Sequence, residues 1–144
     1  MSAAQLRIFV LWACTGLFLL RVLGQLEVVL IAPAWLPPME QWYSGLLPYP
    51  LLLPAQIAIL MLMTGLVVSE MRGARRWHNR NRLRVAALIY FAAMLARLII
   101  QYLRGADDVI AAGGIPVAFH WVLALFLLVL SRTTTSTRAS GRSP

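Results

Sequence analysis

Lysine, cysteine and charged residues in general are scarce in this chain of 144 residues. Lysine is absent, so all 13 basic residues are arginine, which we attribute to the base composition of the coding sequence. The single cysteine, Cys14, excludes an intramolecular disulfide and a cysteine-ligated metal cluster. Charged residues make up 12% of the chain and hydrophobic residues 60%, whereas about a quarter of a soluble domain is charged. These proportions exclude an ordinary soluble domain and favour lipid as the solvent.

Catalytic signatures are missing as well. The sequence contains no G-x-S-x-G, H-E-x-x-H or C-x-x-C motif and no phosphate-binding loop. Its two histidines, His78 and His120, fall on opposite sides of the expected membrane and cannot jointly hold a haem or a metal ion. We therefore expect no cofactor and no metal, and nothing in the sequence favours an enzyme.

Four long apolar segments are present instead, at about residues 8–32, 51–69, 85–103 and 115–130. Each comes near the ~20 residues that a helix needs to cross ~30 Å of hydrocarbon. Backbone groups in lipid must be satisfied within the segment, and the alternation typical of barrel strands is absent, so we expect helices. The predicted fold is all-α, a polytopic membrane bundle of four transmembrane helices in residues 1–131. A disordered cytoplasmic tail, residues 132–144, follows.

Arginine is concentrated on one side of the predicted membrane. Arg7, the second connection and the C-terminal tail share that side, whereas the other connections hold Glu40, Asp107 and Asp108. This bias predicts a bacterial-type inner membrane protein with both termini cytoplasmic. We expect Glu70 to pair with an arginine of the second connection. The arginines of that connection are expected to contact anionic lipid headgroups, not nucleic acid: Arg72, Arg75, Arg76, Arg80, Arg82 and Arg84.

Polar residues recur at matching positions inside the apolar segments. The stretch LLRVLGQ, with Arg21 and Gln25, aligns with LARLIIQ, which holds Arg97 and Gln101. Both spans run outward, so the two pairs are expected at similar depth in the outer half of the bilayer. One polar residue of each returning span falls at the same depth. We call this set the polar layer: Arg21, Gln25, Gln56, Arg97, Gln101 and His120.

Two interpretations of the polar layer remain open. An arginine facing lipid costs at least ~2.5 kcal/mol, so the layer is expected to face inward. It either forms a structural network with Glu27, Asp107 and Asp108 as counter-ions, or it binds an anionic ligand. Candidate ligands are a lipid headgroup, a carboxylate or a quinone-type carbonyl, because guanidinium grips carboxylate or phosphate through paired donors. His120 is expected to be either a hydrogen-bonded packing residue or part of that site.

The first outer connection, residues 33–50, is rich in proline and aromatic residues. Trp35 suits the membrane–water interface, where an aromatic ring keeps its polar edge hydrated. The segment is either a connector lying along the membrane surface or a lid over a site beneath it.

Three stretches carry a resemblance to a known family. They are LLRVLGQ from residue 19, GLLPYPLLLP from residue 45 and RLRVAALIYFAAMLA from residue 82. The pattern resembles that of DoxX-like small membrane proteins, which implies a four-helix fold. Members of that family have been linked to quinone-coupled sulfur or redox chemistry. This chain lacks the usual lysine after the first helix and has Gln56 where an acidic residue is often expected, so the resemblance implies the fold alone.

The leading functional prediction is a non-enzymatic membrane protein that acts as an accessory or assembly partner, or that binds a lipid or another anion. Its expected partners are membrane lipids, other membrane subunits or further copies of itself. One alternative is a small oligomeric transporter or channel subunit, and a second is a subunit of a quinone-linked oxidoreductase. No catalytic residue is assigned in any of these.

Overall fold

The described structure consists of four α-helices. The computed structural model describes residues 1–31, 33–36, 49–73, 80–105 and 113–132. The helices are α1 (Ala3–Ile31), α3 (Tyr49–Met71), α4 (Arg80–Leu103) and α5 (Gly114–Ser131). All four are long and apolar enough to cross a membrane, which confirms the prediction of an all-α chain with four such helices. Of the predicted tail, only Arg132 lies within the described residues.

Helices α1 and α4 each begin five residues before the apolar segment that predicts them. Helix α1 begins at Ala3 because Ser2 and Gln5 form a capping box: the Gln5 backbone N–H donates to Ser2 Oγ (3.2 Å) and the Ser2 backbone N–H donates to Gln5 Oε1 (2.7 Å). Helix α4 begins at Arg80 rather than at residue 85. Its first turn reads RNRLR, and arginine is a good helix former. Hydropathy therefore locates the apolar part of a helix but not its first turn.

Glycines end two of the helices. Gly73 (φ 64°) follows α3 and Gly105 (φ 98°) follows α4. Their N–H groups donate to the carbonyls of Glu70 and Tyr102, both at 3.1 Å. The left-handed conformation is inexpensive for glycine alone, so these two residues stop the helices while satisfying terminal carbonyls.

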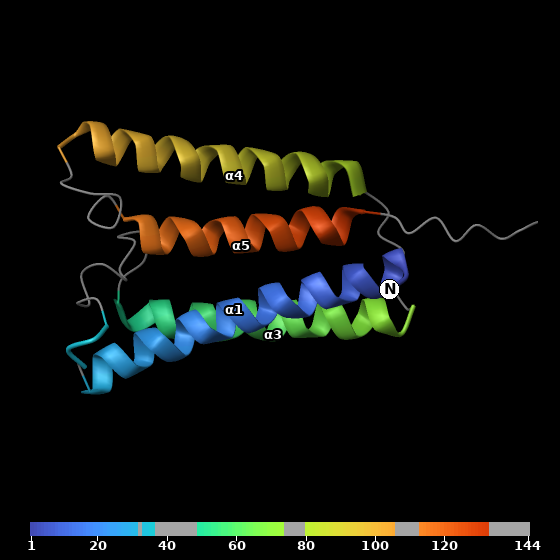
Figure 1. Cartoon of the computed structure of the whole chain (residues 1–144), viewed down its shortest axis with the longest axis horizontal. Coiled ribbons are helices and arrows are strands. Elements are labelled where there is room, and N and C mark those ends of the chain that lie inside the picture. Colours follow the sequence, from blue (N-terminus) through green and yellow to red (C-terminus); the bar gives the residue numbers. More distant parts are fainter. Residues whose placement is uncertain (32, 37–48, 74–79, 106–112, 133–144) are drawn as a thin grey trace, which may run out of the picture.

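The four helices do not close into a square bundle (Figure 1). Helix α5 lies between α4 and α1, and α1 packs against α3. Among the described residues, α3 and α4 do not approach each other, so the bundle is open on that side. Helix α4 consequently buries only Ala87 and exposes most of its apolar side chains.

The hydrophobic core lies between α1, α3 and α5. Its largest fully buried side chains include Leu11, Val67, Phe126 and Leu130. The core lies toward the helix ends that are beside the N-terminus in Figure 1. Polar groups replace the apolar core toward the opposite ends of the same helices, and that polar region contains the candidate site.

Candidate functional site

Arg21 is buried because it lies on the core-facing stripe of α1. The buried positions of this helix recur every three or four residues, which defines one face. They are Leu11, Cys14, Thr15, Phe18, Arg21, Val22, Gln25 and Val28. The side chain of Arg21 is therefore only 7% exposed, although it carries a formal charge.

A glutamine pair lies one helical turn beyond Arg21. Gln56 of α3 donates from Nε2 to Oε1 of Gln25 over 2.8 Å, and both side chains are 3% exposed. The pair links α1 to α3 across their interface. The side-chain oxygen of Gln56, Oε1, is buried and has no hydrogen-bond partner among the described residues. The sequence predicted equal depth for these two glutamines, and the structure places them in direct contact.

The guanidinium of Arg21 is only partly satisfied. Its Nε atom is buried and, within the described part of the chain, has no hydrogen-bond partner. Its guanidinium carbon lies 5.5 Å from the centroid of the Phe119 ring of α5, which is within cation–π distance. A π face attracts a cation but does not accept the in-plane N–H bonds that a carboxylate or phosphate would accept.

Arg21 and Phe119 line two adjoining spaces. The first, which we call the inner cavity, has a volume of about 100 Å³ between α1, α3 and α5. Its lining includes Phe18, Arg21, Gln56, Phe119, His120 and Leu123. The second, the side hollow, has a volume of about 470 Å³. Its lining includes Leu20, Arg21, Glu27, Trp35, Leu36 and Phe119. The guanidinium thus lies where a small space meets a larger one.

His120 joins the inner cavity to α4. Its Nδ1 shares a short hydrogen bond with the Tyr90 hydroxyl, and the two rings meet edge to face with centroids 5.6 Å apart. His120 also interacts electrostatically with both Arg21 and Arg97. Arg97 is partly buried on α4, two turns after Tyr90. His120 is thus the common neighbour of two arginines of the polar layer.

Two functional residues of this region escaped the sequence analysis, Tyr90 and Phe119. Tyr90 lies seven residues before Arg97, so it shares the helix face of that arginine, and this spacing could have identified it. Phe119 had no comparable signal, because its role depends on which helix packs against α1.

The remaining predicted site residues are placed differently. Gln101 is exposed on α4 and does not line the inner cavity or the side hollow. Glu27 lines the side hollow together with Arg21, but the two do not form an ion pair. Asp107 and Asp108 lie outside the described residues. Among the residues that are described, no group of three histidine, cysteine or acidic side chains could hold a metal ion.

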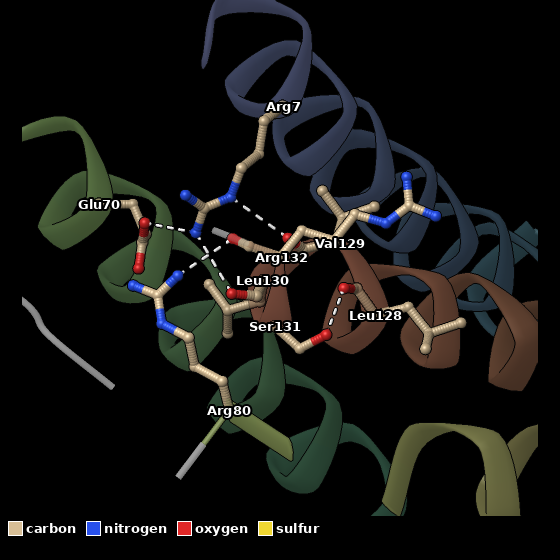
Figure 2. Close-up of polar contacts among 8 residues, drawn as sticks. All are labelled: Arg7, Glu70, Arg80, Leu128, Val129, Leu130, Ser131 and Arg132. Atoms are coloured by element: carbon tan, nitrogen blue, oxygen red, sulfur yellow. Dashed lines mark hydrogen bonds and ion pairs between the residues drawn. The ribbon is translucent and has the colours of Figure 1, made fainter. Parts of the chain in front are cut away.

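A second polar cluster ties the opposite helix ends together (Figure 2). Arg7 of α1 forms an ion pair of 2.5 Å with Glu70 of α3. It also donates from Nε to the Val129 carbonyl and from Nη2 to the Leu130 carbonyl, both at 3.2 Å. These carbonyls belong to the last turn of α5, where the helix dipole favours a cation. Glu70 was expected to pair with an arginine of the second connection, whereas its described ion pair is with Arg7.

The predicted headgroup arginines lie at this same end of the molecule. Arg72, Arg82 and Arg84 are exposed. Arg80 donates from Nη1 to the Arg132 carbonyl over 3.2 Å and so links the start of α4 to the end of α5 (Figure 2). Arg75 and Arg76 lie outside the described residues.

Comparisons with known proteins add no relative. A scan against protein-family models matched no family, and searches of curated proteins and of solved structures found no match. The resemblance to DoxX-like proteins therefore stays a prediction about the fold.

Proposed function

We propose that the chain crosses a bacterial-type inner membrane four times, with both termini in the cytoplasm. The four helices have the required length and apolarity. Arg72, Arg80, Arg82 and Arg84 gather at the end where α3 finishes and α4 begins, which fits the positive-inside bias. The exposed apolar side chains of α4, such as Ile89 and Ile99, face acyl chains in this arrangement.

We further propose that the protein binds an anionic ligand at Arg21. The observation that carries this proposal is a guanidinium that is 7% exposed, with an Nε donor that lacks a partner among the described residues. A charged side chain at such a depth in lipid costs at least ~2.5 kcal/mol, and an unpaired one is rarely retained without a use. A phosphate or carboxylate at this position supplies the missing acceptor through charge-assisted hydrogen bonds, each of about 1.5–3 kcal/mol.

Gln56 and His120 complete the site around that anion. Both line the inner cavity with Arg21. The buried Oε1 of Gln56 is a hydrogen-bond acceptor without a donor among the described residues. The bound group therefore carries a hydroxyl that can donate to it, or is accompanied by a water molecule that does so. The cavity of about 100 Å³ holds roughly three molecules the size of water, at ~30 Å³ each. That volume suits part of a headgroup but excludes a nucleotide or a sugar.

The test is native mass spectrometry of the protein extracted from its own membrane in mild detergent. Wild-type protein is expected to retain one lipid or other molecule that carries a phosphate or carboxylate, and Arg21→Gln is expected to lose it while remaining folded. Arg104→Gln is the matched control, because Arg104 is exposed just beyond the end of α4. Arg21→Lys is expected to retain weakened binding, since it keeps the charge but loses the paired donors. Equal ligand retention by the wild type and Arg21→Gln would refute the proposal.

A further inference from the structure

The side hollow contains one cation and one anion in otherwise apolar walls. Arg21 and Glu27 both line it, and the other lining side chains are those of leucine, phenylalanine and tryptophan, with one glycine. Six residues separate the two charges on α1, which corresponds to ~9 Å of rise and ~240° of rotation. They form no ion pair. The hollow therefore presents two opposite charges to whatever occupies it, without neutralising either one internally.

Trp35 lies at the same hollow as Glu27. A tryptophan face attracts an ammonium group, and a carboxylate beside it adds an opposite charge. Together they form the pair of groups that recognises an organic cation. Arg21, with its unpartnered Nε, recognises an anion. The two halves of the hollow are thus complementary to the two charges of a zwitterion.

From this arrangement we infer that the side hollow binds the zwitterionic headgroup of a phospholipid. The phosphate lies at Arg21 and the ammonium lies between Glu27 and Trp35. This inference rests on the proposed anion-binding function and adds the cationic half of the ligand. The volume of about 470 Å³ accommodates roughly fifteen groups the size of water, enough for a phosphoethanolamine-type headgroup and its glycerol.

The depths of the two charges match the order of groups in a lipid. Glu27 is four residues from the end of α1 at Ile31, or ~6 Å, whereas Arg21 is ten residues from it, or ~15 Å. In the proposed topology α1 runs outward, so Arg21 is deeper in the membrane than Glu27. A phospholipid of the outer leaflet likewise has its phosphate nearer the hydrocarbon than its ammonium. The apolar walls between the two charges suit the carbon skeleton that joins those groups.

The inference is tested by lipid competition in nanodiscs with equal amounts of dioleoyl phosphatidylethanolamine and dioleoyl phosphatidylglycerol. The protein is released from the nanodiscs, and the lipids that remain bound to it are counted by native mass spectrometry. The wild type is expected to enrich phosphatidylethanolamine about fivefold, as one cation–π contact assisted by a carboxylate allows. Glu27→Gln is expected to lower this preference to near one. Trp35→Leu, a second variant with no charge change, is expected to lower it partway.

Each outcome separates this inference from the function on which it rests. If Glu27→Gln and Trp35→Leu both keep the wild-type preference, the zwitterion assignment is wrong, although anion binding at Arg21 stands. If Arg21→Gln retains as much lipid as the wild type, the anion site itself fails. Soluble glycerophosphoethanolamine distinguishes the source of the zwitterion. Displacement of the lipid by it at equal concentration would overturn the assignment to a membrane lipid, and failure to displace supports it.

Discussion

Removing either partner of the Arg7–Glu70 ion pair should destabilise the protein strongly, whereas removing both should cost less than the two separate losses added together. The side chains are 11% and 7% exposed, so the ion pair stabilises two charges that are largely shielded from solvent. Loss of one partner from a buried pair costs about 3–5 kcal/mol. We expect about 3 kcal/mol for Glu70→Leu, because Arg7 keeps the Val129 and Leu130 carbonyls as acceptors. The double variant, Arg7→Met with Glu70→Leu, should cost about 2–3 kcal/mol less than the sum of the two single changes.

A double-mutant cycle measures this coupling directly. Reversible unfolding in mixed micelles of dodecyl sulfate and dodecyl maltoside, followed by circular dichroism, gives the free energy of unfolding for each variant. The expected coupling energy is about 2–3 kcal/mol. Arg80→Met serves as the control, since its hydrogen bond to the Arg132 carbonyl is exposed and its loss should cost about 0.5 kcal/mol or less. Additive single effects, with a coupling below ~0.5 kcal/mol, would show that the pair does not stabilise the junction of α1, α3 and α5.

Three further changes probe the polar layer and the topology. Gln56→Leu should lower the free energy of unfolding by about 1 kcal/mol, because it breaks the hydrogen bond to Gln25. Adding Gln25→Leu should lower it little further. Fully additive losses would show that the two glutamines do not form this hydrogen bond. Tyr90→Phe should lower the melting temperature by removing its bond to His120, and unchanged melting would show that this bond does not hold α4 to α5. In a chain without its native cysteine, Ser2→Cys should react with an impermeant maleimide only from the cytoplasmic face. Labelling from the outer face would reverse the topology.

The sequence was sufficient to predict the helices because their apolarity is a local property. Long apolar runs predict α1, α3, α4 and α5 without knowledge of their neighbours. The first turn of α4 was missed because its arginines resemble a polar connection, although arginine is compatible with a helix. Which helices pack together is not local information. The packing order, in which α5 lies between α4 and α1, could not be derived from composition.

The candidate site shows the same division. Equal depth was enough to bring Gln25 and Gln56 into one layer, and the structure joins them by a hydrogen bond. Depth alone also placed Gln101 in that layer, yet its helix face turns it outward. The direction in which each helix face points also determines that the Phe119 ring lies against the Arg21 guanidinium. Pairing across helix ends, as between Arg7 and Glu70, likewise depends on packing order, since many arginines were available to that carboxylate.

The central claim is that Arg21 holds an anionic group at the junction of the inner cavity and the side hollow. A high-resolution density map of the protein, extracted with its native lipids in polymer nanodiscs, tests this most directly. The account predicts density for a phosphate or carboxylate within hydrogen-bond distance of Arg21 Nε. A map in which Arg21 Nε donates only to water or to another side chain of the protein would contradict the proposed anion site.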